Sequence, residues 1–95
     1  MKPGQVAVAP RHQALEDRVA QLVTAALGKK PGSVKPGDAL FSGQSGFDSF
    51  SLMELVLRLE DSFGLRIPDE DLDPDIFHSI RTIAAYLQSR LEQRD

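Results

Sequence analysis

The sequence predicts a small all-α bundle in a single domain. Apolar residues recur at helical spacing in three segments, capping residues or glycines stand near the ends of these segments, and no segment alternates as a strand does. The chain has 95 residues, 41% of them hydrophobic, which suffices for one modest core. It has no cysteine, so disulfides and cysteine-based metal sites are excluded.

The first helix is expected to begin at Arg11 and to end before Gly28, a favourable C-terminal cap followed by Pro31. Its apolar face comprises Leu15, Val19, Leu22, Val23 and Ala26. Two prolines and a glycine in residues 1–10 predict a disordered tail, which leaves residues 11–95 as the domain. The next segment, residues 29–47, is rich in proline and glycine and predicts a long loop, held to the core through Ala39, Leu40 and Phe41.

The strongest helix is expected over residues 49–63, because Asp48, Ser49 and Ser51 suit its start and Gly64 suits its end. One apolar stripe faces the core, formed by Leu52, Leu55, Val56, Leu59 and Phe63. After Pro68 we expect an irregular acidic segment with a short helical turn around residues 73–77. The last helix is expected from Ser79 to Arg90 or a little beyond, burying Ile80, Ile83, Ala84, Leu87 and Leu91.

Met53 and Leu57 lie outside this core stripe, among the carboxylates of Glu54, Glu60 and Asp61. Such a pair fits either a docking surface or ordinary isolated exposed residues. Residues 48–75 carry nine carboxylates against two arginines, which fits a partner with a basic surface or simply a solvated face. The net charge of −3 argues against nucleic acid as a partner.

No apolar run approaches the roughly 20 residues that span a bilayer. The first ten residues do not have the composition of a secretory signal. We therefore expect a cytoplasmic protein that does not interact with membranes.

Residues 46–50, Gly-Phe-Asp-Ser-Phe, resemble the acyl and peptidyl carrier protein family, whose members place Asp-Ser and a large apolar residue at the start of their second helix. The resemblance continues through Leu-Met-Glu-Leu-Val at 52–56, Phe-Gly at 63–64 and Ile-Pro-Asp-Glu at 67–70, and covers about residues 15–91. It implies the carrier four-helix bundle, with three longer helices, a long first loop and a short third helix near residues 73–77.

The resemblance further implies that Ser49 accepts 4′-phosphopantetheine from coenzyme A, with Asp48 beside it contacting a metal or a basic group of the modifying transferase. The residue chemistry agrees, because backbone N–H groups at a helix N-terminus favour a phosphate. Taken alone, Ser49 would more often be a helix cap. If Ser49 is modified as the resemblance implies, the chain is a stand-alone, monomeric carrier and not an enzyme. Its thiol is then supplied by the prosthetic group.

The implied partners are a phosphopantetheinyl transferase, an adenylate-forming acyl- or aminoacyl-activating ligase and downstream acyl-transferring enzymes. We expect them to dock on Phe50, Met53, Glu54, Leu57, Glu60 and Asp61. Fatty-acid-synthesis carriers usually have an acid where this chain has Ser51, and a small residue at Arg58. These departures favour secondary metabolism or aminoacyl loading over primary fatty acid synthesis, which is the alternative.

Two further hypotheses find little support in the sequence. The aspartates at 69, 71 and 73 open like a calcium-binding loop, but Pro74 and Ile80 stand where that loop needs glycine and glutamate, so we expect no metal. Neither His12 nor His78 has the context of a catalytic base.

The serious alternative is a helical interaction module that binds through Met53 and Leu57 without a prosthetic group. Modification of Ser49 distinguishes the two.

Overall fold

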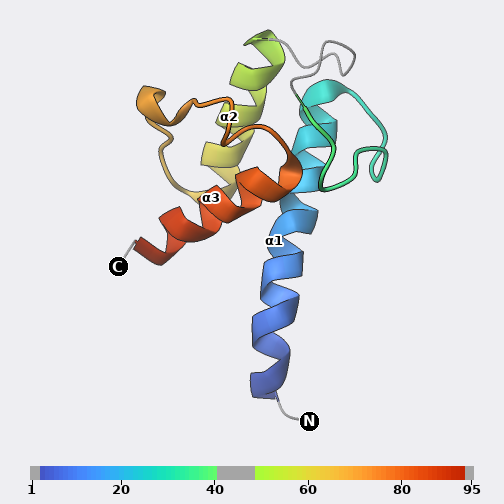
Figure 1. Ribbon diagram of the computed structural model, residues 1–95, viewed down its shortest axis with the longest axis vertical. Helices are drawn as coiled ribbons and strands as arrows, with labels where there is room; N and C mark the ends of the chain where they lie inside the picture. The colour runs from blue at the N-terminus through green and yellow to red at the C-terminus, as the bar shows by residue number, and fades with distance from the viewer. Residues whose placement is uncertain (1–2, 41–48, 94–95) are drawn as a thin grey trace.

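The computed structural model describes residues 3–40 and 49–93, and within them the chain forms a helical bundle without strands (Figure 1). Three α-helices follow one another as α1 (Pro3–Leu27), α2 (Ser49–Phe63) and α3 (Ile80–Gln93), with a short 3₁₀ helix, η1 (Asp69–Asp71), between the last two. The predicted all-α fold is confirmed. In the described part of the chain, no helix combines the length and the apolar character needed to cross a membrane.

Helix α1 begins at Pro3 and not at Arg11, so the helix is longer than the sequence predicted. Proline is tolerated in the first turn of a helix, where its missing N–H has no intrahelical partner to lose. Ala7 and Ala9 favour the helix that continues through the segment for which we expected a disordered tail. Pro10 lies inside this helix, where its missing N–H removes one intrahelical hydrogen bond without ending the helix. The division into residues 1–10 and 11–95 stays a prediction. The N-terminal half of α1 projects beyond the other two helices (Figure 1).

Gly28 and Gly64 end α1 and α2 as predicted. Both adopt a left-handed backbone, with φ of 71° and 65°, which costs glycine little. The N–H of Lys29 donates to the carbonyl of Thr24 at 2.8 Å, and the N–H of Leu65 donates to that of Glu60 at 3.3 Å. These bonds partner carbonyls of the last helical turn and turn the chain away.

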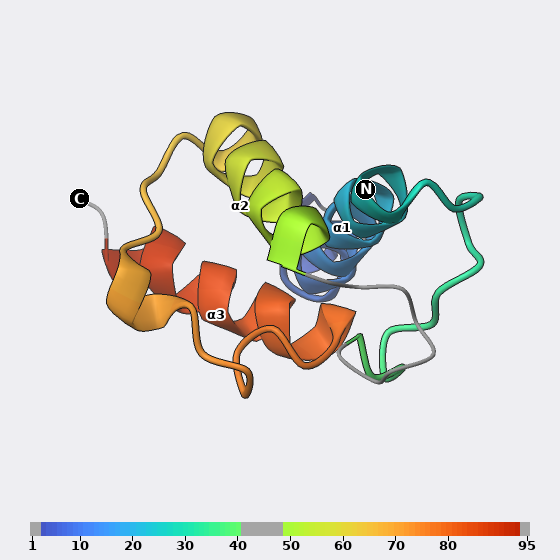
Figure 2. The same ribbon diagram turned by 90° about the horizontal axis from the view of Figure 1, so that it is seen from above.

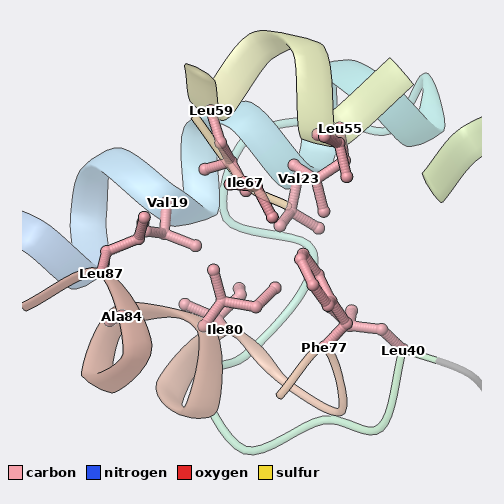
Figure 3. Packing of buried hydrophobic residues seen from close by; sticks show 12 residues of the cluster. Val19, Val23, Leu40, Leu55, Leu59, Ile67, Phe77, Ile80, Ala84 and Leu87 are labelled. Carbon is pink, nitrogen blue, oxygen red and sulfur yellow. The ribbon is translucent and has the colours of Figure 1, made fainter. Parts of the chain in front are cut away.

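The core lies where α1 packs against both α2 and α3 (Figure 2). The predicted inner face of α2 is confirmed, because Leu55, Val56 and Leu59 are buried while Leu52 and Phe63 pack at its margin. Figure 3 shows side chains of α1, α2 and α3 converging there with residues of the connecting segments. The core comprises Val19, Val23, Leu40, Leu55, Val56, Leu59, Ile67, Phe77, Ile80, Ile83, Ala84 and Leu87. Because α2 buries one face here, its opposite face is available to solvent.

Leu40 attaches the long first loop to this core, as the sequence predicted. Its side chain is 1% exposed, and its N–H donates to the carbonyl of His78 at 2.7 Å. Ala39 beside it is exposed, and Phe41 lies outside the described residues. Arg81 adds a second tie, because its N–H donates to the carbonyl of Pro36 at 3.0 Å. The loop is therefore held against the start of α3.

The segment between η1 and α3 forms one helical turn where the sequence predicted a short third helix. The N–H groups of Ile76 and Phe77 both donate to the carbonyl of Asp73, at 2.9 and 3.1 Å. The turn ends at Phe77, and α3 begins at Ile80, directly after Ser79. Its hydroxyl accepts from the N–H of Thr82 at 3.2 Å, and the Thr82 hydroxyl accepts from the N–H of Ser79 at 3.0 Å. This reciprocal cap fixes the first turn of α3.

Candidate functional site

Helix α2 begins at Ser49, the position that the sequence predicted. Its first turn is at the surface, since Phe50, directly after Ser49, is 79% exposed. The N–H groups of a first helical turn lack intrahelical partners and carry the positive end of the helix dipole. A phosphate ester at this end fits both features. Asp48 and the side chain of Ser49 lie outside the described residues.

Three other serines have hydroxyls that already serve the fold. Ser79 is buried in the cap of α3, and Ser62 accepts a hydrogen bond from Nε of Arg18 at 2.9 Å. Ser33 donates to the carbonyl of Lys30 at 2.7 Å. Ser51, one helical step beyond Phe50, is half-buried. The start of α2 combines a helix N-terminus, which favours an attached phosphate, with an exposed surface, whereas Ser79 at the start of α3 is buried.

An apolar stripe runs along the outer face of α2. Phe50, Met53 and Leu57 follow one another at spacings of three and four residues, which places them on one side of a helix. Their exposed fractions are 79%, 49% and 59%. Because these apolar residues lie in a row next to a candidate modification site, they form one contiguous surface and are not isolated exposed residues. We call Phe50, Met53 and Leu57 the outer stripe.

One edge of the outer stripe carries an ion pair. Both Nε and Nη2 of Arg58 contact Oε2 of Glu54, at 3.0 and 2.9 Å. The two side chains are 41% and 39% exposed, so the pair lies at the surface. Glu54 was expected to meet a basic partner, but here a cation of its own helix already neutralises its charge. The sequence contained the signal, since Glu and Arg four residues apart on a helix form such pairs.

The carboxylate of Glu60 also has an internal partner. Its Oε2 accepts a hydrogen bond from the backbone N–H of Ile67 at 2.8 Å. Because Ile67 is buried in the core, this bond holds the chain that leaves α2. Asp61 is exposed and borders a shallow hollow of about 530 Å³ that Leu57 and Arg66 also line. The predicted docking residues thus share the outer side of α2, but their carboxylates differ in what they already bind.

Tyr86, Asp71 and Arg90 form a polar cluster that the sequence analysis missed. The Tyr86 hydroxyl donates to Oδ2 of Asp71 at 2.6 Å, and Nη1 of Arg90 donates to the Tyr86 oxygen at 2.6 Å. Nη2 of Arg90 donates to the carbonyl of Arg66 at 2.8 Å. Burial, together with the bond to Asp71, raises the pKa of Tyr86 above its ordinary value. The cluster fastens η1 and the chain after α2 to α3.

An apolar hollow of about 490 Å³ lies at the other end of the bundle. It borders Phe63, the last residue of α2, about 21 Å along the helix axis from Ser49. Its lining comes from α1, α2 and α3 and comprises Ala14, Leu15, Arg18, Phe63, Gln88, Leu91 and Glu92. This hollow is therefore separate from the start of α2.

The described residues hold no group of three or more His, Asp or Glu side chains placed to bind a metal ion. His78 is exposed, and the side chain of His12 is not among those described. The aspartates of the 69–75 segment instead make local contacts, as when Oδ1 of Asp73 accepts the N–H of Asp75 at 2.8 Å.

Comparisons with known proteins agree on one family. The profile of the phosphopantetheine attachment site matches residues 17–87, a stretch that includes all of α2. An acyl carrier protein from Bdellovibrio bacteriovorus is 34% identical over 77 residues, which cover 81% of this chain and 95% of that protein. The solution structure of a holo acyl carrier protein from Nitrosomonas europaea matches with a TM-score of 0.72 and 19% identity. It covers 85% of this chain and 99% of that one, and supports the fold.

Proposed function

Because this chain belongs to the phosphopantetheine-binding family of acyl carrier proteins, we propose that Ser49 is the residue that bears its prosthetic group. That group is 4′-phosphopantetheine, held covalently; when bound, it supplies the thiol on which an acyl group is carried as a thioester. The chain is a carrier and not an enzyme. Its own residues have two tasks, to hold the arm at a defined place and to offer a surface to the enzymes that use it.

The position of Ser49 at the start of α2 is the observation that carries the assignment. The helix N-terminus favours the negative phosphate, and the exposure of Phe50 supports access of an enzyme to this end of α2. The inner face of α2 packs in the core, so an arm attached at Ser49 extends from a helix that the core holds in place. A tether of this kind keeps the carried group at a high effective concentration near a partner.

Partners of the carrier are a phosphopantetheinyl transferase and acyl-handling enzymes. We propose that they dock on the outer stripe and on Glu54, Glu60 and Asp61 around it. Three exposed apolar side chains give each enzyme the same contact, and the surrounding charges make that contact sensitive to salt. Weak binding suits a carrier that visits several enzymes in turn.

For the pathway, we propose secondary metabolism or aminoacyl loading, with an adenylate-forming ligase as the loading enzyme. The Glu54–Arg58 pair supports this preference because it leaves the outer side of α2 less acidic than its carboxylates alone suggest. We also propose a cytoplasmic location, because the attachment of the prosthetic group needs coenzyme A as its donor. Loading assays on the modified carrier, with fatty acids, hydroxy acids and amino acids each paired with its ligase, test the preference. Loading by fatty acid synthase enzymes alone would contradict it.

The attachment site is tested by intact-protein mass spectrometry after incubation with coenzyme A and a broad-specificity phosphopantetheinyl transferase. The wild type and Ser51→Ala should each gain one phosphopantetheinyl group, whereas Ser49→Ala should gain none. Ser51→Ala is the matched control because it removes a hydroxyl from the same helical turn. A gain by Ser49→Ala would refute the assignment.

The second candidate function is an interaction module without a prosthetic group. The exposed Met53 and Leu57 favour it, since they would serve a binding partner equally well. If wild type stays unmodified under conditions in which a known carrier is fully converted, this second function replaces the first.

A further inference from the structure

The Glu54–Arg58 pair borders the outer stripe along much of its length. On a helical projection, Phe50 and Leu57 mark the middle of the exposed side of α2, with Glu54 and Arg58 following on one edge and Glu60 on the other. An enzyme that covers the outer stripe must therefore also cover or skirt the pair. Within α2, the Arg58 guanidinium is the one positive charge among three carboxylates.

The geometry of the pair leaves Arg58 able to contact a partner. Nε and Nη2 contact the same oxygen of Glu54, whereas Nη1 has no partner among the described residues. Arginine has five N–H donors, so it can bind a second carboxylate without releasing the first. A lysine or arginine of a partner that approached Glu54 would instead come close to the Arg58 cation. The pair thus disfavours a cation and accepts an anion at this edge.

We propose that Arg58 is a specificity-determining residue of the docking surface. It selects against enzymes whose contact surface is uniformly basic, and it favours enzymes that place a carboxylate opposite its guanidinium. This inference rests on the proposed docking through α2 and specifies the partner: an apolar recess for the outer stripe, an acidic group on the Arg58 edge and a basic group for Asp61. Repulsion of unsuitable partners is a recognised source of specificity.

The C-terminal end of the surface also fits a partner of mixed charge. The carboxylate of Glu60 accepts a hydrogen bond from the backbone N–H of Ile67, and Arg66 lines the same hollow as Asp61. Arg66 thus adds a second cation, beyond the C-terminal end of α2, to a surface whose other charges are mostly carboxylates. A partner that carried only lysine and arginine would meet Arg58 on one side and Arg66 at the end.

The test measures binding of the unmodified chain to an acyltransferase of fatty acid synthesis chosen for a docking face lined with lysine and arginine. Arg58→Ala should bind about two- to fivefold more tightly than wild type at low ionic strength, the range expected when one exposed ion pair becomes available. High salt should remove the difference. In a Glu54→Gln background, Arg58→Ala should have a smaller effect, because the released carboxylate is no longer there.

Arg81→Ala is the charge-matched control. Arg81 is an exposed arginine on α3, 3.9 Å from Glu16, so its removal changes the net charge equally without altering the α2 surface. An equal gain for Arg58→Ala and Arg81→Ala, or no gain for Arg58→Ala, would overturn the inference. A second arm reverses single basic residues of the enzyme to glutamate. At least one reversal should strengthen binding of the wild-type chain and weaken binding of Arg58→Glu. If no reversal does so, Arg58 does not discriminate between partners by their charge.

Because the binding assay uses the unmodified chain, its result does not depend on Ser49. A chain that shows the Arg58 effect but never gains phosphopantetheine would refute the proposed function and keep the charge selection. A chain that is modified normally but shows no Arg58 effect would refute the charge selection and keep the proposed function.

Discussion

Replacing Glu60 by alanine should destabilise the fold, although the side chain was first predicted as a docking residue. Its carboxylate accepts the N–H of Ile67 at 2.8 Å, across the turn that Gly64 begins. The Ile67 side chain is 6% exposed and belongs to the core. Removal of the acceptor leaves this N–H without its partner at a place where the chain must stay close to the core.

The expected cost follows from the kind of bond that is lost. A hydrogen bond to a charged group contributes about 1.5–3 kcal/mol, and an unsatisfied buried donor costs about 1–3 kcal/mol. Glu60 is only half-buried, so water can partly replace the carboxylate. We therefore expect Glu60→Ala to lower the free energy of unfolding by about 1–2 kcal/mol. Glu60→Gln retains a neutral acceptor and should lose about half as much.

Urea unfolding followed by circular dichroism measures both variants. Glu54→Ala is the control on the same helix, since its exposed pair with Arg58 should contribute less than about 1 kcal/mol. If Glu60→Ala proves as stable as wild type, the bond to Ile67 does not hold the chain after α2. If Glu60→Ala does destabilise the fold, a docking role for Glu60 is best tested with Glu60→Gln, which removes the charge with less damage.

Three further predictions concern the polar cluster, the long loop and the outer stripe. Because the pKa of Tyr86 is raised in the folded state, the stability of the fold is retained at pH values below the ordinary tyrosine pKa of 10.0 and falls as the pH rises through the folded-state pKa. In urea titrations from about pH 9 to 11, Tyr86→Phe should therefore lose less stability than wild type. Equal losses would contradict this. Leu40→Ala should cost about 2–4 kcal/mol of unfolding free energy because it empties a fully buried site; a cost below about 1 kcal/mol would show that the loop is not anchored there. Leu57→Asp should change stability by less than about 1 kcal/mol yet slow modification by the transferase, and an unchanged rate would remove Leu57 from the docking surface.

The sequence predicted α2 to the residue because several signals agree there. The apolar period of the inner face, the polar residues at its start and the left-handed Gly64 at its end all mark the same 15-residue helix. The exposure of Met53 and Leu57 followed from the same period. These features depend on local spacing, which a single sequence contains.

Other features depend on contacts between distant residues or on competing local rules. The Glu60–Ile67 bond spans seven residues and the Tyr86–Asp71 bond spans fifteen, so no helical period indicates them. The start of α1 was placed too late because Pro3 is compatible with a helix start as well as with an irregular tail. The Glu54–Arg58 pair was readable from its spacing, but its effect on docking emerges only with the exposed outer stripe beside it.

The most direct test of the account is to locate the prosthetic group by tandem mass spectrometry of peptides from the modified wild-type chain. The account predicts that the phosphopantetheinyl mass is found on the peptide that contains the start of α2 and that fragmentation assigns it to Ser49. Its assignment to any other residue would contradict the site. Its absence, with a known carrier converted in the same reaction, would contradict the carrier function itself.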